Sequence, residues 1–149
     1  MEKYTQVMGE LGRAEGVEFK FGGTIANTLN AHRLIQWVQE TKGLEAAGKV
    51  VDSLYTQYFT QEAHPSSHST LLKAATAAGV DEQEAKKFIE DEDERKMETM
   101  NEIREQADNE VDSVPYVMVE GRRRDFTLIG AKSVEEYAKC LKQVEKESK

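Results

Sequence analysis

Val114-Pro115, followed by Tyr116-Val117-Met118-Val119, is the stretch that decides the fold, because it is the one clear β-strand in a largely helical sequence. Proline is tolerated at the first residue of a strand, where its missing N–H breaks no ladder hydrogen bond. A polar turn over residues 120–125 comes next, and Phe126-Thr127-Leu128-Ile129 forms a second strand. Ser133 and Glu136 then make a capping box that starts a closing helix. The pattern predicts strand, turn, strand and helix.

Helical periodicity dominates the sequence before this stretch. Apolar spacing predicts helices over residues 3–15, from 27 or 28 to 42, over 44–61, through 71–78, through 85–89 and over about 92–109. The expected helix caps are Asn27 or Thr28, then Ser69 or Thr70, then Asp81 in a capping box with Glu84. Residues 17–21 alternate between apolar and polar side chains, which predicts a short strand or extended segment.

The composition places the chain among soluble, highly charged proteins. At 149 residues, with 38% hydrophobic and 32% charged side chains, we expect one domain with a real core. No apolar run approaches the roughly 18 to 20 residues of a membrane span, and no signal peptide is visible. A net charge of −8 argues against nucleic acid as a partner. Arg122-Arg123-Arg124 is a basic exception, either a solvated turn or a contact for an anionic partner.

The chain has one cysteine, Cys140, and no Cys-x-x-Cys. An internal disulfide is therefore excluded, which suits a reducing compartment, and we expect a cytoplasmic location. Cys140 lies within a predicted buried stripe of the closing helix, which favours packing over reactivity. The expected members of that stripe are Val134, Tyr137, Leu141 and Val144. We accordingly predict no catalytic residue in this chain.

Two histidines, His64 and His68, have the spacing of a helical metal-ligand pair. Pro65 prevents a regular helix between them, and no cysteine or carboxylate stands nearby to complete a zinc site. The segment is therefore expected to be a loop. We predict neither a metal nor a cofactor.

A set of short motifs together resembles a known family. The motifs are Gly16-Val17-Glu18-Phe19-Lys20-Phe21, Asn27-Thr28, Ala31-His32-Arg33-Leu34-Ile35, Leu54-Tyr55-Thr56-Gln57-Tyr58-Phe59, Val114-Pro115 and Gly130-Ala131. In this order they resemble the DsbA-like family of thioredoxin-fold oxidoreductases. The branch they most resemble is the FrnE type, which is related to kappa-class glutathione transferases and 2-hydroxychromene-2-carboxylate isomerases.

The resemblance implies a helix-rich α/β protein with an incomplete thioredoxin-like fold. Residues 1–149 would form one DsbA-like thioredoxin domain, in which 1–112 are mainly the helical insertion and 113–149 the closing strand, strand and helix. In the family, a first strand, a Cys-x-x-Cys and a second strand would stand ahead of residue 1. Their absence is expected to reflect either a truncated gene model or a chain that genuinely lacks the catalytic front end.

The resemblance also implies an activity and a set of site residues. Family members are protein disulfide oxidoreductases, and Pro115 matches their cis-proline, beside which the backbone of Val114 would pair with a protein or thiol/disulfide substrate. Asn27, Thr28 and His32 would line a ligand cleft, although helix capping and packing explain the same residues. Without the cysteine pair, we expect little thiol–disulfide exchange by this chain itself.

Two other functions are compatible with the sequence. A two-stranded hairpin is marginal alone, and its open edge is a pairing site. The chain could therefore be a non-catalytic interaction module that forms a homodimer or accepts a strand-completing partner. It could also bind glutathione, as the kappa-class relatives do.

Overall fold

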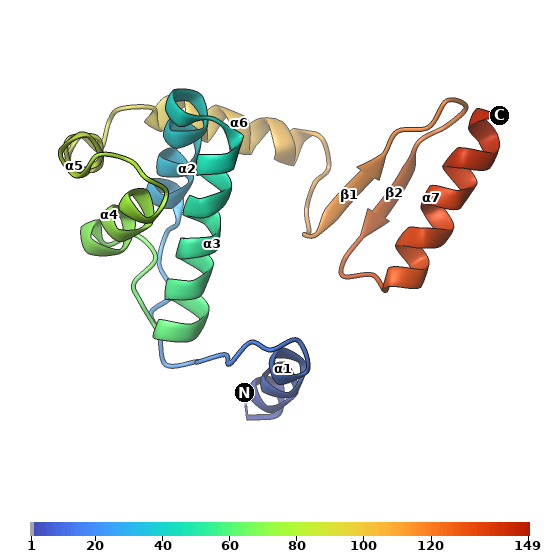
Figure 1. The fold of residues 1–149 in the computed structure, drawn as a ribbon, viewed down its shortest axis with the longest axis horizontal. Helices are drawn as coiled ribbons and strands as arrows, with labels where there is room; N and C mark the ends of the chain where they lie inside the picture. Colours follow the sequence, from blue (N-terminus) through green and yellow to red (C-terminus); the bar gives the residue numbers. More distant parts are fainter. Residues whose placement is uncertain (1) are drawn as a thin grey trace. The chain divides into compact units, whose positions relative to one another are not determined.

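The computed structural model describes residues 2–149 and divides into two compact units, Met1–Asn101 and Glu102–Lys149, with the boundary inside helix α6 (Figure 1). The elements in chain order are α1 (Glu2–Ala14), α2 (Leu29–Lys42), α3 (Leu44–Gln61), α4 (His68–Ala77), α5 (Glu82–Glu90), α6 (Lys96–Asp108), β1 (Tyr116–Val119), β2 (Phe126–Ile129) and α7 (Val134–Ser148). The helix-rich architecture expected from the periodicity is confirmed. The division expected at residues 112 and 113 stays a prediction.

The core of the first unit lies among α2, α3, α4 and α5, where each helix packs on the next. Trp37 of α2 stacks on Phe88 of α5, with ring centroids 4.5 Å apart and planes tilted by 10°. Such aromatic pairs stabilise a core by about 0.5–1.5 kcal/mol beyond their buried area. Around them lie fully buried aliphatic side chains, namely Leu34, Val38, Val50, Ala74, Ala75 and Ala85.

One charged side chain, Arg33 of α2, is enclosed in this core with 1% of its surface exposed. Its Nε donates to the carbonyl oxygen of Glu94 over 2.8 Å, and its Nη2 donates to the carbonyl oxygen of Asp91. The guanidinium also lies 5.1 Å from the centre of the Phe88 ring. Arg33 therefore joins α2 to the turn between α5 and α6.

A turn occupies the residues at which the sequence predicted the start of a helix, about residue 92, so that predicted start was wrong. The Asp91 side chain accepts hydrogen bonds from the backbone N–H groups of Asp93 and Glu94, which holds residues 91–94 in a turn. Helix α6 begins only at Lys96. The carbonyl groups of Asp91 and Glu94 in this turn accept hydrogen bonds from Arg33, which satisfies them outside a regular helix.

Residues 17–21 form the extended segment that was one of the two predicted alternatives, and not a strand of a sheet. The segment is extended, but its contacts are to α3: the Lys20 N–H donates to the Phe59 carbonyl over 2.8 Å, and the Phe19 and Phe59 rings meet edge to face. Beyond it, the Glu62 carboxylate accepts the Gly22 N–H over 2.8 Å. The aromatic residues that gave the alternating pattern thus dock on a helix instead of a sheet.

The helix caps agree in part with expectation. The Asn27 side chain accepts the Leu29 N–H over 2.9 Å, and Asp81 accepts the N–H groups at the start of α5. Helix α4 is capped by Ser67, whose hydroxyl accepts the Thr70 N–H, so the expectation of Ser69 or Thr70 as cap was wrong. The reason is that α4 already begins at His68, one turn before the apolar run.

The second unit contains the antiparallel hairpin β1–β2 with α7 beside it. Val117 pairs with Leu128 and Val119 with Phe126, so these four side chains share one face of the hairpin. All four are partly buried, and Phe126 and Leu128 adjoin Cys140 of α7. On the other face, Met118 is 55% exposed. The hairpin therefore has one covered and one open face.

Helix α7 starts as expected, with Ser133 and Glu136 closing a complete capping box. The buried stripe is different from the expected one, because Val134 and Leu141 are exposed. The side of α7 that faces inward carries Tyr137, Cys140 and Val144, at positions i, i+3 and i+7.

Replacing Arg33 tests whether its contacts hold the first unit together. We expect Arg33→Leu to lower the free energy of unfolding by about 2–4 kcal/mol, because it leaves the carbonyl groups of Asp91 and Glu94 without their donors. Arg33→Lys should recover only part of the loss, since an ammonium cannot donate to both oxygens in the same way. Urea unfolding followed by the fluorescence of Trp37, the single tryptophan, measures this core directly.

The control is Lys49→Ala, which removes an exposed i,i+4 pair with Glu45 and should change stability by no more than about 0.5 kcal/mol. An Arg33→Lys protein as stable as the original would contradict the role given to the forked guanidinium.

Candidate functional site

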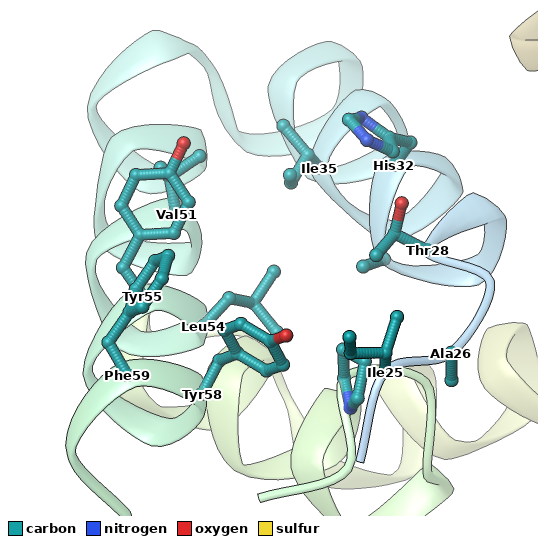
Figure 2. Close-up of a pocket in the computed structure, with 12 residues that line it drawn as sticks. Ile25, Ala26, Thr28, His32, Ile35, Val51, Leu54, Tyr55, Tyr58 and Phe59 are labelled. Atoms are coloured by element: carbon teal, nitrogen blue, oxygen red, sulfur yellow. The ribbon is translucent and has the colours of Figure 1, made fainter. Parts of the chain in front are cut away.

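The first unit contains an apolar cavity of about 470 Å³ between α2 and α3 (Figure 2). The floor is buried, with Ala31 and Leu54 less than 9% exposed, whereas Ile25 at the rim is 90% exposed. Figure 2 shows the α2 side chains facing those of α3 across the space. The complete lining is Ile25, Ala26, Thr28, Ala31, His32, Ile35, Val51, Leu54, Tyr55, Tyr58, Phe59 and Pro65.

Helix α3 forms the aromatic wall of this cavity. Its apolar residues lie on two sides of the helix, one in the core and one facing the cavity. Val50 is buried in the core, Leu54 is buried at the floor of the cavity, and Tyr55 and Tyr58 form its wall. The 3.6-residue period places positions 51, 55 and 58 on one side of the helix and 50, 54 and 57 on another. The sequence pattern identified the aromatic helix, but it did not separate the residues of the core from those of the cavity.

The structure brings together two of the three residues expected in a ligand cleft. Thr28 and His32 both line the cavity, one turn apart at the start of α2. Asn27 does not line it: its side chain caps α2, and its carbonyl oxygen accepts the Ser66 hydroxyl. Thr28 is the N-cap residue of α2 without a side-chain cap hydrogen bond, and Asn27 supplies the side-chain acceptor instead. A ligand contact by Thr28 and His32 stays a prediction.

Several polar groups in the cavity wall are available to a ligand. Across residues 2–149, no hydrogen bond within the chain engages the His32 imidazole, the Thr28 hydroxyl or the Tyr58 hydroxyl. In Figure 2 the Tyr58 hydroxyl points into the space between the helices. None of the lining residues is Asp, Glu, Lys or Arg. The cavity thus combines apolar walls with uncharged hydrogen-bonding groups.

Val114 and Pro115 lie in the second unit, at the start of the hairpin. The peptide bond between them is cis, and Val114 is 83% exposed. The Pro115 carbonyl accepts the Gly130 N–H over 2.8 Å, which ties this end of β1 to the residue after β2. The backbone of Val114 is consequently presented at the open end of the hairpin.

Two of the three arginines at the hairpin turn contact the end of α7. Arg124 forms an ion pair with Glu147 over 2.7 Å and lies 4.8 Å from the centre of the Phe126 ring, and Arg122 donates to the Ser148 carbonyl. The hydrogen bond raises the pKa of Arg124 and lowers that of Glu147. This cluster therefore connects the hairpin to the helix.

Cys140 is a free thiol on the buried side of α7, with 8% of its surface exposed. Among the described residues, no group of three or more His, Cys, Asp or Glu is arranged to hold a metal ion. Residues 2–149 likewise contain no helix with the length and apolar character needed to cross a bilayer.

The first unit is a helical region, and the second is an antiparallel hairpin with a closing helix. A model of the DSBA-like thioredoxin domain matches residues 1–142, and the chain belongs to that family. Among curated proteins, none matches this chain.

The fold is also similar to a solved structure, described as that of a "putative protein disulfide isomerase from Nitrosomonas europaea". The TM-score is 0.75 at 18% sequence identity, and the match covers 95% of this chain and 73% of that one. At this identity, the likeness supports the fold.

The burial of Cys140 predicts slow labelling of the folded protein. We expect Ellman's reagent to react with native Cys140 more slowly than with the urea-unfolded chain, by a factor of roughly ten or more, because the thiol is enclosed. The matched control is Cys140→Ala with Leu141→Cys, which moves the thiol to a side chain position that is 57% exposed and should react at once. Equal rates for native and unfolded Cys140 would contradict the packing role.

Proposed function

We propose that this chain is a DsbA-like domain that binds extended thiol- or disulfide-bearing peptides beside Val114 and does not itself exchange their disulfides. The observation that carries the proposal is the combination of an exposed Val114, which precedes the cis peptide bond, with a single, buried cysteine. Membership of the DSBA-like family supports a thiol-bearing substrate class.

The chemistry of thiol–disulfide exchange supports the proposal that this chain does not itself exchange the disulfides of its substrates. A thiolate must attack a disulfide sulfur to form a mixed disulfide, and a second thiol must resolve it if substrate is to leave oxidised. Cys140 is the only cysteine and faces the hairpin from α7. The chain therefore has no thiol pair with which to complete a cycle.

The hairpin register supports the proposed binding of an extended peptide beside Val114. The Gly130–Pro115 hydrogen bond marks residues 115 and 130 as a hydrogen-bonded pair, and such pairs alternate with non-bonded ones along an antiparallel ladder. The N–H and C=O groups of Tyr116 and Met118 consequently point away from β2, on the same side as those of Val114. These groups form a free edge to which an extended peptide can add.

Insulin reduction by dithiothreitol tests the absence of exchange. We expect the chain to precipitate insulin no faster than dithiothreitol alone, and Cys140→Ser to behave identically, because the enclosed thiol takes no part. Robust turnover that Cys140→Ser abolishes would refute the proposal.

The hairpin edge also favours a second candidate function, addition of a strand from a partner or from a second copy of this chain. Strand β1 is uncharged from Tyr116 to Val119, whereas natural edge strands usually carry charges or other blocking features. Met118 and Ile129 are about half exposed on the open face of the hairpin. A strand added beside β1 would extend the open face of the hairpin that carries Met118 and Ile129.

Two proline substitutions distinguish the edges of the hairpin. Met118→Pro and Thr127→Pro each remove an N–H that points outward, from β1 and from β2 respectively, without removing a ladder donor. If β1 is the pairing edge, Met118→Pro should make the chain monomeric in light scattering or weaken peptide binding roughly tenfold, and Thr127→Pro should leave both unchanged. A strictly monomeric original protein whose β1 amides exchange slowly would count against strand addition.

The proposed family branch and cellular location are inferred from the sequence. Placement in the FrnE-type branch depends on the Asn27-Thr28 and Ala31-His32-Arg33 motifs, and a cytoplasmic location depends on the single cysteine. Binding of glutathione near Val114 predicts a thermal shift at millimolar glutathione, and its absence would remove that alternative.

A further inference from the structure

We propose that the cavity between α2 and α3 binds a small, uncharged aromatic molecule that carries a hydroxyl or carbonyl group. This inference concerns the first unit and stands independently of the function proposed for the hairpin. It assigns the cavity to a small molecule of defined chemistry, not to a charged metabolite or a nucleotide.

The size and shape of the cavity favour a small molecule. Small-molecule sites commonly enclose about 300–1,000 Å³ and are lined mainly by apolar and aromatic side chains. The cavity here holds about 470 Å³ above a buried floor of Ala31 and Leu54. A molecule of two fused rings is small enough for this volume, and the exposed Ile25 marks the rim through which it would enter.

The aromatic wall favours a ring. Tyr55, Tyr58 and Phe59 follow one another along α3, and the Phe59 ring already meets both tyrosines edge to face, at centroid separations of 5.7 and 5.0 Å. An aromatic ligand extends this cluster with offset or edge contacts of the same kind.

The charge of the lining favours a neutral ligand. No lining side chain is Asp, Glu, Lys or Arg, so an ionised ligand would lose water and gain no opposite charge in return. The groups that remain for recognition are the Tyr58 hydroxyl on α3 and the His32 imidazole and Thr28 hydroxyl on α2. These groups come from both walls of the cavity, so a polar substituent on the ligand can hydrogen-bond to either helix.

Fluorescence displacement on the full chain at pH 8 tests this assignment. N-phenyl-1-naphthylamine, an uncharged probe, should brighten on binding, and 2-naphthol should displace it. Naphthalene should bind several-fold more weakly because it offers no hydrogen bond, and 2-naphthoate at least tenfold more weakly because its carboxylate meets no cation. Displacement by 2-naphthoate as effective as by 2-naphthol would overturn the assignment to uncharged ligands.

Substitutions locate the site. Tyr58→Phe should weaken 2-naphthol about fivefold and leave naphthalene unchanged, whereas Tyr4→Phe, the same chemical change at an exposed position on α1, should alter neither. Ile35→Trp, which fills the cavity, should abolish binding of both compounds. Unchanged affinity in Ile35→Trp, or equal losses for the two compounds in Tyr58→Phe, would overturn the proposal.

Methyl NMR of the unaltered chain gives a readout that does not depend on the variants folding. Saturating 2-naphthol should shift the methyl signals of Ile25, Ile35 and Leu54, while those of Ile89 in the core and Ile129 in the hairpin stay in place. Shifts at Ile129 with none at Ile35 would place the ligand on the other unit and refute the site.

Discussion

The first unit depends on the burial of one charge, the guanidinium of Arg33. Burial lowers its pKa, and the nearby carboxylates, Asp91 first among them, act in the opposite direction. The backbone oxygens of Asp91 and Glu94 complete its environment, so the acidic run before α6 surrounds a buried cation. A buried charge is tolerated only where its donors are satisfied, and this requirement fixes how α2 meets the turn between α5 and α6.

The same helix builds the candidate ligand site from its other side. Neighbouring residues on an α-helix point about 100° apart, so Arg33 faces the turn while His32, one position earlier, lines the cavity. The rigid packing around Trp37 and Phe88 holds α2 in place and thereby positions Thr28 and His32 opposite the tyrosines of α3. A feature of the core that touches no ligand thus determines the geometry of the cavity.

Much of the fold could be predicted from the sequence because local patterns determine it. The bounds of α3, both strands and the capping box of α7 follow from periodicity and caps over a few residues. The partners of Arg33, by contrast, lie 58 and 61 residues away, and no local pattern indicates them. Residues 17–21 alternate like a strand but donate to α3, and the exposed Val134 and Leu141 share the spacing of buried residues. Periodicity shows that one face of a helix or strand is apolar, but it does not show which part of the chain packs against that face.

The contact between Arg124 and Glu147 has a consequence for how the second unit acquires its structure. It joins the hairpin turn to the end of α7, and together with the β1–β2 pairing it keeps the contacts of this unit between segments that are neighbours in the chain. The helices of the first unit likewise pack mainly on their sequence neighbours. Chains whose contacts join nearby residues pay little loop-closure entropy before each contact forms, and they fold quickly. The hairpin and α7 therefore have the local connectivity that lets the contacts of this unit form without first closing a long loop of chain.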